Sequence, residues 1–266
     1  MIIHVVTLNQ HRCNKLIASL LSEALLLAGH AVVSNINQKD IDFIIAINGA
    51  ADSTTEDIVE NIRETGKKVV LFCDDVDILP AYDANVYVKQ FFSDIVTSDA
   101  IQFPIAELLT LHKDWGLVRK ETKRPFEWFY GGTVKQRRQY EPFFNNNMVR
   151  HTTMLLAGDD EEWDYIANVH EVQSAISRVD TIRDLDTLYN IMRLCKNTAL
   201  VYDEKHFGKG MPLRFFEAAL CGMGVFVFDS QGDYIFYTPK QIKHLYTKQQ
   251  TINKVKGLVW NIKQLM

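Results

Sequence analysis

The stretch EWFYGGTVKQRRQYEPFF, residues 127–144, contains a group of residues suited to binding a diphosphate. Gly131 and Gly132 carry no side chain, so a ligand can approach the backbone closely there. A helix that begins after them offers free backbone N–H groups and the positive end of its dipole. Three cations follow within a few residues: Lys135, Arg137 and Arg138. The stretch therefore predicts a phosphate site, and the alternative is a tight turn that leads into a basic surface helix.

A second group of polar residues lies in GMPLRFFEAALCGMGVFVFD, residues 210–229. Arg214 and Glu217 are three residues apart, which places them on one face of a helix. Pro212 favours a helix start nearby. The glutamate can accept both hydroxyls of a ribose, and the arginine can reach a phosphate. An ordinary surface ion pair is the alternative.

An aspartate follows the apolar run KKVVLFC at residues 67–73. Asp74 stands where the chain leaves this run, and its carboxylate suits a general base that removes a hydroxyl proton. A turn cap is the alternative. Asp75 and Asp77 form an Asp-x-Asp pair that can help to hold a divalent ion. The sequence shows no complete set of metal ligands, so we expect no metal site in the protein.

Strands and helices alternate along the chain. Apolar strands are expected at 2–7, 31–36, 42–48, 67–73, 126–132, 152–158, 198–203 and 224–229. Helices are expected at 13–30, 56–66, 135–146, 183–195, 212–222 and 252–266. The region 80–125 is less regular. This order predicts an α/β chain with parallel sheets covered on both faces. We expect two domains, 1–118 and 119–266, with the last helix, about 250–266, packing back on the first domain.

Ligands of such sheets bind outside the carboxyl ends of the strands, and this rule selects the loops to inspect. The first such loop, NQHR at 9–12, lacks the G-x-G-x-x-G pattern of a dinucleotide site. We therefore place the nucleotide in the second half of the chain. His11, Arg12 and Asn48 are candidate contacts to a sugar or an acceptor. The alternative for the first two is the opening turn of a helix.

Three motifs resemble those of the T-even bacteriophage DNA β-glucosyltransferases, which are GT-B glycosyltransferases. YGGTVKQRR is similar to their strand with Gly-Gly-Ser and basic residues, LRFFE to Leu-Arg-x-x-Glu, and LFCD to a Leu-Phe-x-Asp strand end. The resemblance implies two Rossmann-like domains facing a cleft, with the acceptor in the first and the nucleotide-sugar in the second. It implies a hexosyltransferase that moves a sugar, with glucose favoured, from a UDP-sugar to a 5-hydroxymethylpyrimidine in DNA, with inversion.

The same resemblance assigns roles to residues of this sequence. Asp74 would be the catalytic base, Arg214 would contact the nucleotide, and Glu217 would take the ribose hydroxyls. The residues that would surround the diphosphate are Gly131, Gly132, Thr133, Lys135, Arg137, Arg138 and His206. The donor would be UDP-glucose or another UDP-sugar. A divalent metal can assist the departure of the diphosphate, but no visible ligand set requires one.

Composition and terminal sequence indicate in which cellular compartment the chain is expected. The 266 residues carry a formal net charge of −4, and no apolar run reaches the roughly 18–20 residues of a membrane span. The N-terminus lacks the features of a signal peptide, and four well-separated cysteines fit a reducing cytoplasm. We expect a cytoplasmic monomer, in the host cytoplasm if a phage encodes it, that binds no membrane.

The basic stretch 118–138 is the part of the sequence that suits DNA. With the resemblance, it favours a partner that is double-stranded DNA with modified pyrimidines, as in bacteriophage DNA modification against restriction. Two alternatives stay open. One is a GT-B enzyme with a glycan or small-molecule acceptor, and the other is a non-catalytic nucleotide- or DNA-binding module.

Overall fold

The chain divides into two compact units, each built around one sheet. The computed structural model describes residues 1–9, 11–48, 56–73, 84–89, 100–117, 123–131, 141–158, 175–180, 182, 184–201, 210–229 and 231–266. Unit 1 comprises Met1–Lys113, Gly208–Leu213 and Tyr246–Met266, and unit 2 comprises Asp114–Phe207 and Arg214–Leu245. The predicted boundary between 118 and 119 lies in 118–122, outside the described residues.

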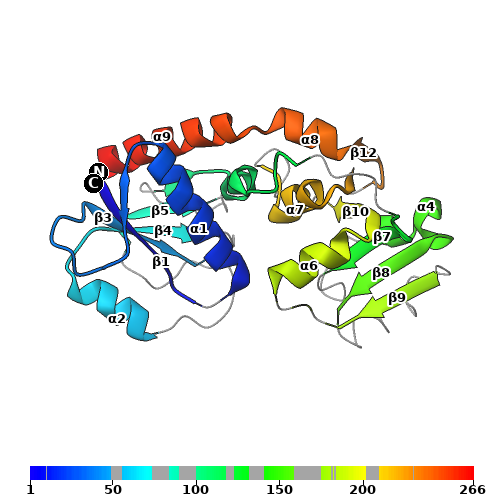
Figure 1. Cartoon of the computed structure of the whole chain (residues 1–266), viewed down its shortest axis with the longest axis horizontal. Coiled ribbons are helices and arrows are strands. Elements are labelled where there is room, and N and C mark those ends of the chain that lie inside the picture. The colour runs from blue at the N-terminus through cyan, green and yellow to red at the C-terminus, as the bar shows by residue number, and fades with distance from the viewer. Residues whose placement is uncertain are drawn as a thin grey trace. The chain divides into compact units, whose positions relative to one another are not determined.

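Unit 1 contains a six-stranded parallel sheet in the order β2-β1-β3-β4-β5-β6 (Figure 1). Its strands are β1 (Ile2–Thr7), β2 (Ala31–Val33), β3 (Phe43–Ile47), β4 (Val69–Cys73), β5 (Val86–Lys89) and β6 (Ala100–Gln102). The central strand β3 is buried at every position, which is why its sequence is continuously apolar. The chain turns from one side of β1 to the other between β2 and β3, so the switch point of this sheet is at β1 and β3.

The helices described in unit 1 are α1 (Arg12–Leu27), α2 (Glu56–Glu64), the 3-10 helix η1 (Ile105–Leu111) and α9 (Lys248–Leu265). The first, α1, buries one apolar stripe and ends at Leu27, and Gly29 just beyond its C-cap has a φ of 91° that few other residues adopt. The last, α9, opens with a capping box from Thr247 and Gln250.

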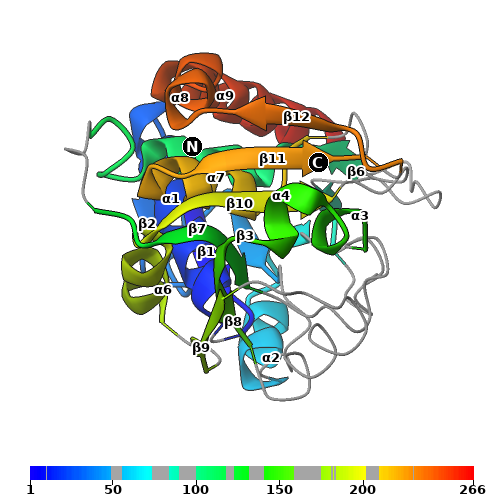
Figure 2. The same cartoon turned by 90° about the vertical axis from the view of Figure 1, so that its right-hand side faces the viewer.

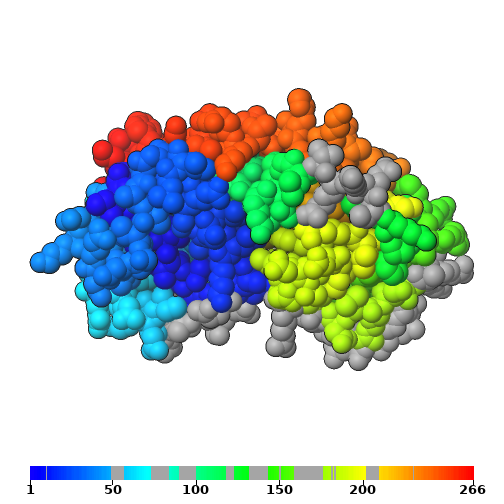
Figure 3. Space-filling model, viewed as in Figure 1, coloured from blue at the N-terminus to red at the C-terminus, as the bar shows by residue number. Residues whose placement is uncertain are grey.

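The helix α9 is distant in sequence from the rest of unit 1 but packs against α1 and η1, and Figure 3 shows it beside α1. Thr110 Oγ1 donates to Thr251 Oγ1 at 2.9 Å. Lys254 Nζ lies 2.6 Å from Glu107 Oε2, and the glutamate is almost fully buried. These polar contacts fix the position of α9 on η1, in addition to the apolar stripe that the helix buries.

Unit 2 contains a sheet in the order β12-β11-β10-β7-β8-β9, which Figure 2 shows from one side. Its strands are β7 (Phe126–Gly131), β8 (Thr153–Ala157), β9 (Ala175–Val179), β10 (Cys195–Val201), β11 (Gly224–Phe228) and the antiparallel β12 (Tyr234–Tyr237). Counted from β7, this is the doubly wound order 3-2-1-4-5-6. The switch point of unit 2 is therefore between β7 and β10.

The helices of unit 2 are α3 (Glu141–Phe144), α4 (Asn147–Arg150), α6 (Leu185–Met192), α7 (Leu213–Cys221, whose first residue is assigned to unit 1) and α8 (Pro239–Leu245). Aromatic side chains dominate the core, with Trp128 and Phe143 in edge contact at 5.4 Å. Trp115, Trp128 and Phe129 are buried, so these rings pack in the core.

The α/β architecture with two mostly parallel sheets confirms the fold class expected from the sequence. Two local expectations were wrong. The region 80–125, expected to be irregular, contains β5, β6 and η1. The helix predicted over 135–146 was placed too far towards its C-terminal end, because α3 ends at Phe144; its predicted start, 135–140, lies outside the described residues. In the part of the chain that the structure describes, no helix is both long enough and apolar enough to cross a membrane.

Candidate functional site

Gly131 stands at the switch point of unit 2, as the last residue of β7. A Cβ atom at this position would lie 2.9 Å from Phe129 Cζ and 3.6 Å from Ala157 Cβ. The first distance is shorter than van der Waals contact allows, so only glycine fits without moving the Phe129 ring. The sequence predicted a glycine that lets a ligand approach, and the geometry adds a packing reason for it.

Arg214 and Glu217 lie on the first turns of α7, directly after the connection from β10. Arg214 Nη1 is 3.4 Å from Glu217 Oε2. The guanidinium carbon lies 5.4 Å from the centre of the Phe129 ring, and Nη1 donates to Met192 Sδ at 3.2 Å. Phe129 thus connects the strand that carries Gly131 with the helix that carries the ion pair.

The Arg214–Glu217 pair is not an ordinary surface ion pair. Glu217 is only 3% exposed, while Arg214 retains about a quarter of its side-chain surface. A carboxylate has about four lone-pair sites and a guanidinium has five N–H donors, so these contacts use only part of either group's capacity. The pair can therefore serve a ligand that brings hydroxyls and anionic oxygens.

A cluster of amides lies at the switch point of unit 1, where β1 and β3 end. Asn9 is its hub: its Oδ1 accepts from the His11 backbone N–H at 3.0 Å and from Asn14 Nδ2 at 2.5 Å. Its Nδ2 donates to Asn48 Oδ1 at 3.2 Å. Asn9, Asn14 and Asn48 are all buried. We call Asn9, His11, Asn14 and Asn48 the amide cluster.

The structure brings the sequence-predicted His11 and Asn48 together through Asn9. His11 caps α1, because its Nδ1 accepts the Cys13 backbone N–H at 3.3 Å, and Arg12 is the first residue of that helix. Both residues thus lie in the opening turn of α1, and their contact to a sugar or an acceptor stays a prediction. Asn9 and Asn14 were not singled out from the sequence. Asn9 lies in the loop NQHR after the first strand, but nothing in the sequence marks Asn14 as buried.

No protein-family model matches the sequence, and no curated protein matches it either. Solved structures do match. T4 phage BGT in complex with its UDP-glucose substrate is 14% identical, with a TM-score of 0.60 over 100% of this chain and 92% of that chain. A second T4 phage BGT structure, with UDP and Mn²⁺, is 13% identical with a TM-score of 0.61 and the same coverage.

Two further matches come from other proteins. An α-glucosyltransferase in complex with UDP-glucose and DNA containing an abasic site is 10% identical, with a TM-score of 0.56 over 99% of this chain and 94% of that chain. AviGT4, a glycosyltransferase involved in avilamycin A biosynthesis, is 13% identical, with a TM-score of 0.60 over 100% and 98%. The chain has the GT-B fold.

Several predicted residues of this GT-B chain lie outside the described residues. They are Asp74, Asp75, Asp77, Gly132, Thr133, Lys135, Arg137, Arg138 and His206. Their roles stay predictions. Within the described ranges, no three His, Cys, Asp or Glu side chains gather as metal ligands would. Asp75 and Asp77 of the Asp-x-Asp pair lie outside those ranges.

The cysteines of unit 2 lie at the end of the sheet opposite the switch point. Cys195 begins β10 and Cys221 ends α7. Burial raises the pKa of the Cys195 thiol to about 12, although the nearby Arg124 acts in the opposite direction. Cys195 therefore stays a protonated, unreactive thiol at neutral pH.

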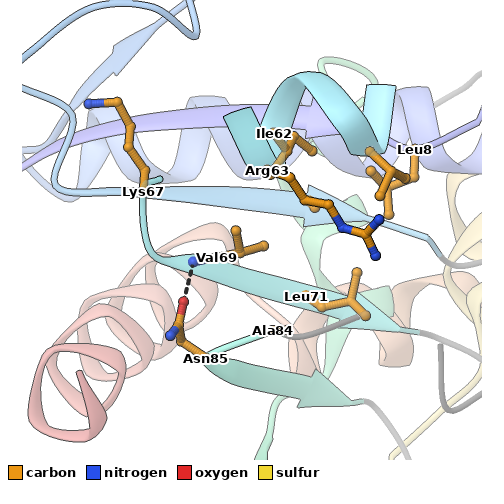
Figure 4. A pocket seen from close by; sticks show the side chains of 10 residues that line it. Leu8, Ile62, Arg63, Lys67, Val69, Leu71, Ala84 and Asn85 are labelled. Carbon is orange, nitrogen blue, oxygen red and sulfur yellow. Dashed lines mark hydrogen bonds between the residues drawn. The ribbon is translucent and has the colours of Figure 1, made fainter. Parts of the chain in front are cut away.

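A pocket of about 230 Å³ lies elsewhere in unit 1, between α2 and β4 (Figure 4). Its wall is mostly apolar. In Figure 4 Arg63 extends over Leu71, while Asn85 Oδ1 turns to accept the Val69 backbone N–H at 2.7 Å. No sequence-predicted site residue lines this pocket, so we do not assign it to the candidate site.

Proposed function

We propose that the chain is a glycosyltransferase that moves a sugar, with glucose favoured, from a UDP-sugar to the hydroxyl of a 5-hydroxymethylpyrimidine in DNA. The observation that carries the proposal is the Arg214–Glu217 pair at the switch point of unit 2, whose carboxylate is buried, beside a glycine whose replacement would have to move the Phe129 ring. This is the position where doubly wound sheets bind nucleotides. The GT-B fold and the UDP-glucose of the matching T4 phage structure support it.

Unit 2 is proposed as the nucleotide-sugar domain. Glu217 would accept the ribose hydroxyls, and Arg214 would contact the nucleotide. Gly131, with Gly132 and Thr133 from the sequence motif, would let the diphosphate approach the backbone. Four side chains of the sequence would add charge and contacts around it: Lys135, Arg137, Arg138 and His206. Cations there would stabilise the charge that develops on the departing diphosphate.

Unit 1 is proposed as the acceptor domain, with Asp74 as the general base. Its carboxylate would remove the hydroxyl proton of the acceptor while the acceptor oxygen forms a bond to the sugar C1. The bond from C1 to the diphosphate oxygen breaks on the opposite side, UDP leaves with that electron pair, and the configuration at C1 inverts. General base catalysis of this kind contributes about 10²–10⁴-fold. His11, Arg12 and Asn48 would contact the sugar or the acceptor.

Duplex DNA is the proposed acceptor because the matching α-glucosyltransferase was solved with DNA and because residues 118–138 are basic. A base must leave the duplex stack before its hydroxyl can react inside a protein. Binding should weaken with salt according to the number of phosphates contacted. We further propose a monomer in the cytoplasm, that of the host if a phage encodes the chain, where the modification would protect DNA from restriction.

The experiment is mass spectrometry of nucleosides after incubation with UDP-glucose and DNA that contains 5-hydroxymethylcytosine or 5-hydroxymethyluracil. The reaction is run with and without Mn²⁺, which accompanies UDP in one T4 phage BGT structure. A nucleoside heavier by one hexose is expected. Asp74→Asn should abolish the product while calorimetry still detects UDP-glucose binding. Retained activity in this variant would show that another group is the base.

A glycan or small-molecule acceptor is the second candidate. The match to AviGT4, a glycosyltransferase involved in avilamycin A biosynthesis, favours it, and neutral amides such as those of the amide cluster can bind sugar hydroxyls. UDP-glucose binding without a DNA product, followed by slow hydrolysis of the donor, would support this candidate. Donor binding with neither transfer nor hydrolysis would indicate a non-catalytic module.

A further inference from the structure

The pocket between α2 and β4 has no part in the proposed reaction (Figure 4). None of the residues assigned to the donor, the acceptor or catalysis is among the described residues that line it. Its volume is about 230 Å³. An engineered protein cavity of about 150 Å³ holds one benzene molecule. This pocket therefore has room for a single ring with a short arm, which is a small molecule and not a peptide.

The walls of the pocket are mostly aliphatic. Leu8 follows β1, Ala46 lies on β3 and Leu71 on β4, and all three are almost fully buried. Val59 and Ile62 face them from α2. All five belong to one apolar cluster of unit 1. A ligand with an apolar body would gain free energy by removing these side chains from water.

Arg63 brings a positive charge to the solvent side of the pocket. In Figure 4 it extends from α2 over Leu71. Its Nη1 lies 3.8 Å from Glu60 Oε2, which is longer than a hydrogen bond. Both side chains of this pair are more than half exposed, so the contact holds the arginine only weakly. The planar fork of the guanidinium can therefore take a carboxylate from a ligand.

The other two polar side chains of the lining, Lys67 and Asn85, also present hydrogen-bond donors. Asn85 Oδ1 already accepts the Val69 backbone N–H at 2.7 Å, which leaves the amide NH₂ group. Lys67 Nζ donates to the Lys39 carbonyl at 3.1 Å and has two more N–H groups. The described acidic residues of α2 do not line the pocket. The polar part of a ligand must therefore accept hydrogen bonds, and a negative charge fits best.

We propose that this pocket binds a small apolar carboxylate of about the size of an arylacetate. The ring lies among the aliphatic side chains, and the carboxylate pairs with Arg63. Burial of the ring supplies most of the affinity, and the guanidinium supplies the preference for an anion. The inference goes beyond the proposed function and does not rest on it. Because the ligand binds the folded state, it also stabilises the protein by mass action.

The first test compares three probes of similar shape: phenylacetate, its neutral amide phenylacetamide, and the cation phenethylammonium. NMR shifts of labelled methyl groups locate the probe and measure its affinity. The methyl groups of Val59, Val69 and Leu71, which line the pocket, should shift. Those of Leu21 on α1 should not. Phenylacetate should bind about tenfold more tightly than the amide, because hydrogen bonds to charged groups are the stronger ones.

Three results of this comparison would overturn the proposal. The first is no shift of the lining methyl groups at tens of millimolar phenylacetate, since a ligand of this size should bind at millimolar concentration. The second is a set of shifts confined to other parts of the protein. The third is equal affinity for the anion, the amide and the cation, which would reject the carboxylate.

A charge substitution tests the role of the guanidinium. Arg63→Met keeps the aliphatic stem, so phenylacetate should lose its advantage of about tenfold while phenylacetamide binds as before. Lys15→Met is the matched control, because Lys15 is an exposed cation of α1 that does not line the pocket. It should change neither affinity. An undiminished preference for phenylacetate in Arg63→Met would reject the ion pair.

A space-filling substitution tests the pocket itself. Ala84 lines it just before β5 and is only partly buried, so Ala84→Leu should fold and should bind neither phenylacetate nor phenylacetamide. Ala31→Leu, at an exposed position of β2, should bind both. If Ala84→Leu does not fold, Val59→Phe narrows the pocket from α2 and decides in the same way. Unchanged binding in the filled variant would overturn the site.

Urea unfolding gives an independent check in the same proteins. At a phenylacetate concentration ten times its dissociation constant, the unfolding equilibrium constant of the wild-type protein should fall about tenfold. That of Ala84→Leu should not change. A wild-type constant that phenylacetate leaves unchanged would contradict a site formed only by the folded protein.

Discussion

The two switch points of the molecule use opposite kinds of polar chemistry. In unit 2 the site consists of a charged pair, Arg214 and Glu217, beside a glycine and an aromatic ring. In unit 1 it consists of neutral amides that bond to one another around Asn9. Each lies where the strand order of its sheet reverses. The same architectural position thus carries charged side chains in one unit and neutral amides in the other.

The difference matches the two substrates that the proposed reaction needs. A nucleoside diphosphate carries negative charge and vicinal hydroxyls, which a guanidinium and a carboxylate recognise. A sugar or a base edge is neutral and presents donors and acceptors, which amides match without adding charge near a reacting carboxylate. If this division holds, unit 2 determines donor affinity and unit 1 does not.

The largest effect is expected for Glu217→Ala. Removing a buried acceptor of two hydroxyls should weaken UDP-glucose binding by roughly 10- to 100-fold, because hydrogen bonds to charged groups are the strong ones. Calorimetry measures the affinity. Glu127→Ala is the control, since Glu127 pairs with Lys196 at the amino end of β7 and should leave binding unchanged. Wild-type affinity in Glu217→Ala would contradict the division.

Asn9→Ala should remove the hub of the amide cluster. Three hydrogen bonds are lost and buried partners are left unsatisfied, so the free energy of unfolding should fall by about 1–3 kcal/mol. Transfer should slow while the donor dissociation constant stays unchanged. Asn35→Ala serves as the control, because Asn35 is exposed and bonds only locally to Asn37. A weaker donor affinity in Asn9→Ala would show that the two switch points are not independent.

Gly131→Ala should have a smaller effect, of about 1–2 kcal/mol on stability, since the new methyl group must displace the Phe129 ring. Because Arg214 lies over that ring, donor affinity should also fall by a few-fold.

Gly257→Ala in α9 is the opposite case: nothing lies within 4 Å of its Cβ position. A helical alanine there should stabilise the protein by about 0.5–1 kcal/mol. Urea unfolding of both variants checks the signs.

The smallest expected effect is a difference in thiol reactivity between Cys195 in unit 2 and Cys13 in unit 1. The pKa of Cys195 is raised to about 12, so below that pH its thiolate is scarce and a thiol reagent should not label it in the folded protein. Cys13, at the start of α1, is only half-buried and should be labelled before Cys195. Mass spectrometry of the labelled peptides follows both sites. Rapid labelling of Cys195 at pH 8 without urea would contradict the buried position of β10.

The sequence predicts central strands well and edge strands poorly. The apolar runs of β1, β3, β4 and β11 are visible because parallel strands buried on both faces need apolar side chains at nearly every position. The short edge strand β6, AIQ, and its neighbour β5, VYVK, lack such runs. The lysine in β5, Lys89, favours the prediction of a loop, although in the structure it is buried. Tertiary pairing overrides local propensity at these positions.

For site residues too, local patterns reveal some positions, and others depend on tertiary contacts. Arg214 and Glu217 are recognisable because their spacing is a helical one and their helix precedes an apolar strand. Asn14 is not recognisable, since an asparagine in the first turn of a helix is ordinary on a surface. It becomes significant only when folding places its amide 2.5 Å from Asn9 Oδ1. Contacts between side chains at the ends of elements depend on tertiary geometry that local patterns do not contain.

The position of α9 has a consequence for synthesis on the ribosome. Unit 1 is completed by residues 246–266, which follow the whole of unit 2 in the chain. At about 5–20 residues per second, synthesis of the intervening residues takes on the order of ten seconds. During that time the face of α1 that α9 covers stays exposed. Unit 2 can thus finish folding before unit 1, the reverse of the usual N-terminal-first order. In cells with little chaperone capacity, degradation of this protein should therefore begin with chains whose unit 1 is still incomplete.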